Sequence, residues 1–329
     1  MLVFIIRRIL LMIPTVFVIS VISFAIIELP PGDYIDAYVD RLTGQLGQSI
    51  DPIEIEALRA RYGLDQPWVV RYWKWISGVL QGDLGRSMQW SMPVNTLILS
   101  RLPWTLLVSV TSLLLVYIIS IPIGIYSATH QYSPGDYLAT LVGFVGLAVP
   151  NFLIALIALW LFYLWTGEVA VGLFSDKYLD APWSFARLVD LLKHIWLPAL
   201  IVGTSGTAGM IRVVRANLLD ELHKPYVMVA RSKGLNEGRI LIKYPMRIAM
   251  NPVASTIGWT LPALVNGELL VSMVLGLPTL APIFVESLIS QDMFLAGSVV
   301  FVLSVLTVIG TLLSDIVLAW LDPRIREAI

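Results

Sequence analysis

Six long runs without a charged residue are the feature that most constrains how this chain folds. A helix needs about 20 residues to cross the hydrocarbon core of a membrane, and each run reaches or approaches that length. Because backbone groups in lipid must hydrogen-bond to one another, each run is predicted to be a transmembrane helix of an all-α six-helix bundle. The composition agrees, since 57% of the residues are hydrophobic and 14% are charged. The runs are Ile9 to Ile27, Leu102 to Thr129, Tyr137 to Gly167, Ile195 to Ile211, Ile248 to Gly267 and Met293 to Ser314.

Prolines inside these runs are expected to kink the helices, because proline lacks the N–H that the helical hydrogen-bond pattern needs. Neighbouring helices can cover the carbonyl groups that this leaves free. The interior prolines are Pro14, Pro122, Pro150 and Pro262.

Charge predicts the orientation of the bundle. The first run follows Arg7 and Arg8 and is longer than the roughly 7 to 15 residues of a secretory h-region, so it is interpreted as a retained helix. With both termini inside, the inner segments hold 12 of the 22 basic residues but only six acidic ones. Basic loops favour the cytoplasmic side. The chain is therefore predicted to be a multi-pass membrane protein with both termini in the cytoplasm, and the resemblance described below implies the cell (inner) membrane.

The predicted organisation has three parts. Residues 1–27 are expected to form the N-terminus and first helix, residues 28–101 a helical extracytoplasmic insert, and residues 102–329 a five-helix transmembrane core. The insert is the one long polar segment between two runs.

Two helices are predicted within the insert. Proline at the first helical position, followed by acids, predicts a helix from Ile53 to Tyr62 that ends at Gly63. A second helix is predicted to begin near Pro67 and to lie at the membrane interface, with contact to a substrate or partner as the alternative. Its aromatic residues are Trp68, Tyr72, Trp73 and Trp75.

Several classes of chemistry lack the residues that they need. A net charge of -1 argues against nucleic-acid binding. The absence of cysteine excludes disulfides and thiolate chemistry. No Gly-Lys dipeptide occurs, so the chain has no Walker A phosphate loop, and no His-Glu-x-x-His occurs either. The chain is predicted to have no ATPase site of its own, no metal site and no bound cofactor.

One short match resembles a catalytic motif. Gly203-Thr204-Ser205-Gly206 has the Gly-x-Ser-Gly form of rhomboid-type intramembrane proteases, but a serine nucleophile needs a nearby base, and none is predicted at that depth. Helix packing through small residues is the favoured interpretation, and an intramembrane serine hydrolase using Ser205 is the alternative. Two acids near run ends, Glu268 and Asp315, are expected to extend toward the interface, with pore lining or helix pairing as the alternative.

A basic segment, Arg212 to Arg247, interrupts the apolar chain. Pro225 predicts the start of a short helix from Tyr226 to Lys233, and Gly234 predicts its end. Asn236 and Glu237 predict the start of a further helix. A helix of about eight residues is too short to be stable alone and must pack against something. A topology signal or a patch for anionic lipids is one interpretation, and a protein-docking element is the other.

The residues of this segment resemble a known family. YVMVARSKGLNEGRILIKYPMR is similar to the cytoplasmic EAA loop of permease subunits in bacterial ABC importers of the dipeptide/oligopeptide/nickel type. Further similar segments lie along the whole chain, and the long insert favours the first-permease type. They are PGD at Pro31, YGLDQP at Tyr62, QGDLGRS at Gln81, IPIGIYSA, HIWLPAL at His194 and LDPRIR at Leu321.

The resemblance implies the type I importer permease fold and a transport function. It implies half of a translocation pathway for peptides, completed by a second, homologous permease. Two cytoplasmic ATPase subunits would bind ATP and Mg, and an external binding protein would deliver the cargo. Oligosaccharides and nickel are the alternative cargoes, and a lipid-anchoring scaffold is a non-transporter alternative.

Site residues follow from the same resemblance. It implies that the short helix docks in an ATPase groove as a coupling helix, although Met228 and Val229 stand where the family has Glu and Ala. The implied docking residues are Tyr226, Val229, Ala230, Arg231, Lys233, Gly234 and Leu235. An outer gate is expected at Leu277, Pro278 and Pro282, where Ser272, Thr279 and Ala281 depart from the family pattern.

Overall fold

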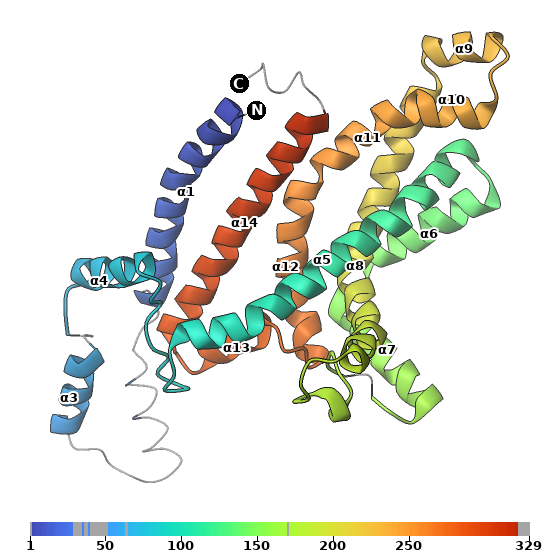
Figure 1. The fold of residues 1–329 in the computed structure, drawn as a ribbon. Helices are drawn as coiled ribbons and strands as arrows, with labels where there is room; N and C mark the ends of the chain where they lie inside the picture. The colour runs from blue at the N-terminus through green and yellow to red at the C-terminus, as the bar shows by residue number, and fades with distance from the viewer. Residues whose placement is uncertain are drawn as a thin grey trace. The chain divides into compact units, whose positions relative to one another are not determined.

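The computed structural model describes residues 2–28, 35, 39, 52–62, 65–169 and 171–321 (Figure 1). Within these ranges the secondary structure is helical, apart from one isolated β-bridge between Arg86 and Pro93. The predicted all-α class is therefore confirmed. The chain divides into two compact units: Met1–Arg8 with Thr105–Pro278 and Ile309–Ile329, and Ile9–Trp104 with Thr279–Val308. The motifs PGD at Pro31 and DPRIR after Leu321, and the predicted helix end at Gly63, lie outside the described residues.

Three described helices are long and apolar enough to cross a membrane. They are parts of α1 (Leu2–Glu28), α5 (Val94–Thr129) and α14 (Met293–Leu321). A fourth span is present if the bent pair α6 (Pro134–Ala148) and α7 (Asn151–Thr166) counts as one. Several apolar helices are thus established, and the count of six stays a proposal.

The third predicted run is not one kinked helix. α6 ends at Ala148, α7 starts at Asn151, and their axes differ by 105°. Pro150 is the N-cap of α7, and Val149 before it is extended, with φ -90° and ψ 124°. The reason is that proline lacks an N–H and disfavours helical geometry in the residue before it, and here the two effects separate the helices completely.

A single long helix, α8 (Phe185–Leu222), forms the centre of the first unit. It contacts α6, α7, α11 (Pro245–Ser255) and α12 (Ile257–Val274). The fourth predicted run is only its middle, because α8 continues without interruption beyond the apolar residues at both ends (Figure 1). The fifth run is divided between α11 and α12 at Thr256.

Small residues let α5 and α8 approach closely. A Cβ atom on Gly124 would lie 2.6 Å from Cβ of Val214, and one on Gly203 would lie 3.1 Å from Cγ2 of Val116. Val116 and Val214 are fully buried with Met210 and Val253 in one apolar cluster. The small face around Ser205 is therefore confirmed as a packing surface at Gly203 and Gly206, whereas Gly209 has open space beside its Cβ position.

The two intramembrane acids lie in different environments. Glu268 is only 1% exposed, and its carboxylate accepts hydrogen bonds from Ser109 Oγ at 3.0 Å and Ser272 Oγ at 3.3 Å. The expectation of extension toward the interface is wrong for Glu268, because these hydroxyls on α5 and α12 replace water. Asp315 lies 3.1 Å from Arg8 NH1, so it takes part in helix pairing.

The second unit contains both predicted helices of the insert, α3 (Pro52–Tyr62) and α4 (Trp68–Leu80). The aromatic residues of α4 divide between two environments. Tyr72 and Trp75 are buried against Phe24 and Phe301, while Trp68 and Trp73 are 60% exposed. The expectation of one interfacial aromatic set is therefore wrong for Tyr72 and Trp75, because they complete the core of the unit.

The other core cluster of the second unit joins the first turns of α5 to α13 (Leu280–Ile289) and α14. Its buried members are Val94, Ile98, Leu280, Ile283, Leu295 and Val299. Asp292 fixes the loop that precedes α5. Its carboxylate accepts hydrogen bonds from Ser87 Oγ and from the Gln89 N–H, while also capping α14 through the Leu295 N–H.

Candidate functional site

The short helix of the basic segment, α9 (Pro225–Ser232), begins and ends where its sequence predicts, within one residue. Pro225 occupies the first turn, and Gly234 has a φ of 71°. The Leu235 N–H reaches the Ala230 carbonyl at 3.5 Å and the Gly234 N–H reaches the Arg231 carbonyl at 2.9 Å. These two bonds form a Schellman motif, which needs a left-handed residue at Gly234.

A second short helix, α10 (Glu237–Lys243), packs back against α9. Asn236 caps it, because its Oδ1 accepts a hydrogen bond from the Gly238 N–H at 2.9 Å. Between the two helices lies a small apolar core of Val227, Ala230 and Ile240, each at most 6% exposed. The partly buried side chains around it are Tyr226, Leu235 and Tyr244.

Two polar contacts hold this helical pair in position. Arg231 donates two hydrogen bonds to Glu237, at 2.8 and 3.2 Å, across the Gly234 turn. The pKa of Glu237 is lowered chiefly by these bonds, and that of Arg231 is raised by the same partner. Tyr226 donates to Glu221 at the end of α8, and burial together with that carboxylate raises the pKa of Tyr226 to about 12. The pair is thus attached to α8.

The sequence-predicted site residues fall on two sides of α9. Ala230, Tyr226 and Leu235 face α10 and contribute internal packing. Val229, Arg231 and Lys233 are exposed, and Met228 beside them is 56% exposed. The exposed face of α9, Met228 with Val229, Ser232 and Lys233, therefore combines two apolar side chains with a basic one. Such a face is suited to contact another protein.

A buried ion pair links α8 to the first turn of α6. Arg215 donates from Nε to Asp136 Oδ1 and from NH2 to Asp136 Oδ2, both at 2.8 Å. Asp136 is 2% exposed and also accepts from the Tyr132 N–H at 3.0 Å. No sequence pattern pointed to this pair. The pair fixes the position of the C-terminal part of α8, which leads to α9.

The residues of the expected outer gate lie around two helix ends. After α12, Gly276 has a φ of 58°, and the N–H of Leu277 reaches the Ser272 carbonyl at 2.9 Å in a second Schellman motif. Leu277 is 2% exposed, and Pro278 follows it. Pro282 lies separately, within the first turn of α13.

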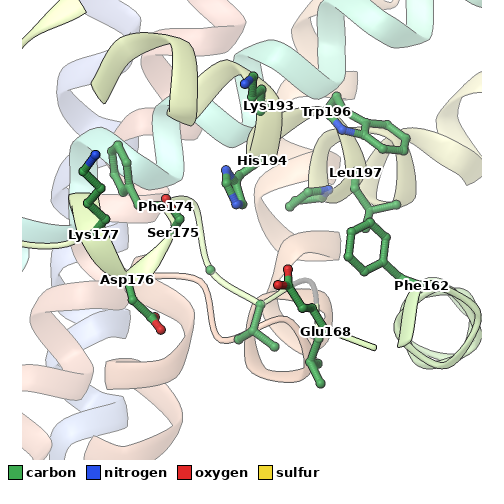
Figure 2. Close-up of a pocket in the computed structure, with 14 residues that line it drawn as sticks. Phe162, Glu168, Phe174, Ser175, Asp176, Lys177, Lys193, His194, Trp196 and Leu197 are labelled. Atoms are coloured by element: carbon green, nitrogen blue, oxygen red, sulfur yellow. The ribbon is translucent and has the colours of Figure 1, made fainter. Parts of the chain in front are cut away.

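A cavity of about 590 Å³, called the α8 cavity below, opens within the first unit (Figure 2). It is lined by Phe162 of α7, by residues within 168–169 and 171–177 after that helix, and by residues within 193–198 of α8. Its charged and titratable lining residues are Glu168, Asp176, Lys177, Lys193 and His194. Sequence reasoning did not identify it, because its residues are spread over three elements.

Hydrogen bonds fix the segment that walls this cavity. Asp190 of α8 accepts from the backbone N–H and the hydroxyl of Ser175, at 2.9 and 2.8 Å. Burial of Asp190 opposes ionisation, but these two hydrogen bonds hold its pKa below the ordinary value. On the other side, the Gly172 N–H donates to the Leu275 carbonyl at 2.8 Å, next to Gly276.

Comparisons with known proteins agree with a helical membrane protein. Residues 120–327 match the family described as binding-protein-dependent transport system inner membrane component, and residues 1–111 match the corresponding N-terminal family. The chain belongs to the family of binding-protein-dependent transport system inner membrane components.

Named relatives extend over nearly the full chain. The chain is 36% identical to the oligopeptide transport system permease protein AppB of Bacillus subtilis, covering 98% of this chain and 99% of that protein. It is 31% identical to the glutathione transport system permease protein GsiC of Escherichia coli, covering 99% of each. It is 30% identical to the peptidoglycan transport system permease protein YejB of Agrobacterium fabrum, covering 98% and 97%.

Proposed function

We propose that this chain is one of two permease subunits of an ATP-driven importer for peptides. A second, homologous permease would complete the pathway, an external binding protein would deliver the cargo, and two cytoplasmic ATPase subunits would bind ATP and Mg. The α9–α10 pair carries the proposal. It is internally packed and tied to α8, yet it presents exposed apolar side chains on α9, which is the arrangement that a docking element needs.

The proposed membrane arrangement has six crossings. They are α1, α5, the α6–α7 pair, α8, the α11–α12 pair and α14, with both termini and the basic segment in the cytoplasm. The excess of basic residues in the inner segments supports this orientation. Residues 28–101 would then lie outside the cell, and Leu277, Pro278 and Pro282 would form the outer gate, supported by the buried Leu277 turn.

Peptides are the proposed cargo. The names of the relatives support this choice, since they include oligopeptide and glutathione permeases. Oligosaccharides and nickel remain the alternatives from the sequence. In the described ranges, no group of three or more His, Cys, Asp or Glu side chains is placed to hold a metal ion.

Replacing both Met228 and Val229 with aspartate tests the docking role of α9. These side chains are 56% and 54% exposed, so the double variant should fold. Full burial of one such side chain stabilises by about 1.5–3 kcal/mol, and about 1.4 kcal/mol corresponds to a tenfold change in affinity. We expect copurified ATPase and peptide uptake to fall more than tenfold. Gln131→Glu, on the exposed α5–α6 turn, is the control for added negative charge. Undiminished ATPase copurification in the double variant would refute docking through this face.

A serine hydrolase that uses Ser205 is the rival from another class. The histidine on the same helix, His194, lies eleven residues from Ser205, which corresponds to about 16 Å along the helix axis. Ser205→Ala is therefore expected to leave uptake within about twofold of wild type, because most substitutions without a packing change have small effects. Uptake and amount of protein in the membrane are measured together. Loss of uptake at a normal protein level would favour a chemical role for the hydroxyl.

A further inference from the structure

The α8 cavity has the size and polarity of a binding site for a small charged molecule. Its volume of about 590 Å³ lies within the roughly 300–1,000 Å³ range of ligand sites. Both signs of charge line it, together with the aromatic side chains of Phe162, Phe174 and Trp196. The proposed docking and gating functions use none of these side chains.

His194 presents a hydrogen-bond acceptor to this cavity. Its Nδ1 lies 2.7 Å from the backbone carbonyl of Asp190. A carbonyl oxygen can only accept, so Nδ1 carries the hydrogen and, in the neutral ring, Nε2 carries the lone pair. The imidazole ring is directed into the cavity (Figure 2).

Glu168 lies across the cavity from His194 (Figure 2). Its carboxylate is directed toward the same space, whereas the carboxylate of Asp176 is directed away. Glu168 takes part in no ion pair with any residue that the structure describes. Two acceptors, one of them anionic, therefore face one another, and an ammonium group is a ligand with the matching charge and several N–H donors.

Contacts within the protein fix the walls of the cavity. Asp190 fixes Ser175 on one side, and Leu275 fixes Gly172 on the other. Arg187 stacks on Phe174 and Trp183, with its guanidinium 4.8 Å from each ring centroid. A preformed site avoids part of the entropic cost of ordering the protein on binding.

We propose that the α8 cavity binds the α-ammonium group of a short peptide, which donates hydrogen bonds to the Glu168 carboxylate and to Nε2 of His194. Lys193 lines the same cavity and supplies the charge that a peptide carboxylate needs. Phe162 supplies apolar surface for peptide side chains. This inference rests on the proposed function, because it takes peptides as the cargo and the outer side as the location of the cavity.

The test uses the complete transporter, purified with its ATPase subunits and second permease but without binding protein. Trialanine and N-acetyl-trialanine are titrated against wild type and Glu168→Gln, which removes the charge and keeps the side-chain shape. We expect wild type to bind trialanine on the order of tenfold more tightly than Glu168→Gln does, because a charge-assisted hydrogen bond is lost. N-acetyl-trialanine lacks the ammonium group, so its weaker binding should be the same for both proteins. Glu286→Gln, an exposed glutamate of α13, is the matched control and should bind as wild type does.

Each alternative outcome is informative. Any of three results would overturn the inference: wild type binds the two peptides equally, wild type and Glu168→Gln bind trialanine equally, or binding is not saturable. ATP hydrolysis stimulated by the binding protein is measured on the same samples. If stimulation is normal while peptide binding fails, only the cavity assignment is lost. If no ATPase copurifies with wild type, the proposed function fails and the inference fails with it.

Discussion

Asp136→Asn is expected to destabilise the folded protein by about 3 kcal/mol, the lower end of the range for breaking a buried ion pair. The carboxylate of Asp136 is 2% exposed and accepts two hydrogen bonds from Arg215. An asparagine amide can replace only one acceptor atom, and it leaves the guanidinium without its counter-charge. The lower end applies because the Arg215 side chain keeps 27% exposure. Unfolding in detergent, followed by tryptophan fluorescence, measures the change.

Two companion variants make this prediction specific. Glu237→Gln breaks the ion pair with Arg231. The side chain of Arg231 is 46% exposed and that of Glu237 is 68% exposed, so the stability of this variant should be indistinguishable from that of wild type in the same assay. Asp136→Asn combined with Arg215→Met removes both charges and should be more stable than Asp136→Asn alone. If Asp136→Asn is as stable as Glu237→Gln, the buried pair does not hold α8 against α6.

Gly234→Val is expected to reduce peptide uptake and ATPase copurification about tenfold. A β-branched residue in the left-handed region costs roughly 1–2 kcal/mol, which lowers the population of the required conformation about 5- to 30-fold. A Cβ at Gly234 would contact nothing within 4 Å, so the cost comes from the backbone and not from a clash. The Schellman motif would open, and the exposed face of α9 would lose its fixed position relative to α8. ATPase copurified per permease gives the direct measurement.

Two neighbouring substitutions separate backbone strain from other causes. Gly234→Asn should keep most of the activity, because asparagine adopts left-handed geometry at lower cost. Gly238→Ala lies in α10 with its Cβ position 3.4 Å from Asn236 Oδ1, and it should also be tolerated. Full activity in Gly234→Val would mean that the turn is not needed for coupling.

Local signals in the sequence were sufficient for the basic segment. Pro225, Gly234 and Asn236 each act within a few residues, so the start of α9, its end and the start of α10 were predicted and are confirmed. The helices of the insert, α3 and α4, were predicted for the same reason. The role of the segment in docking stays a prediction, since it depends on a partner.

Features that depend on the packing of distant residues were not predictable. Whether Pro150 kinks a helix or ends it depends on whether neighbouring helices can shield the carbonyl groups that it leaves free. Here the chain forms two helices, α6 and α7, whose axes differ by 105°. Glu268 was wrongly expected to extend toward water, because its serine partner Ser109 is 159 positions away in sequence. The Asp136–Arg215 pair joins residues 79 positions apart, and nothing in a single sequence links them.

The uninterrupted course of α8 has a thermodynamic consequence. His194 of the cavity and Glu221, which holds α9, lie 27 residues apart on one helix, or about 40 Å. A free energy of coupling between two sites is the same in both directions. If ATP-driven closure of the ATPase changes the affinity of the cavity for its ligand, that ligand must change the closure equilibrium by the same factor. Measuring peptide affinity with and without trapped ATP therefore yields the coupling energy from either end of α8.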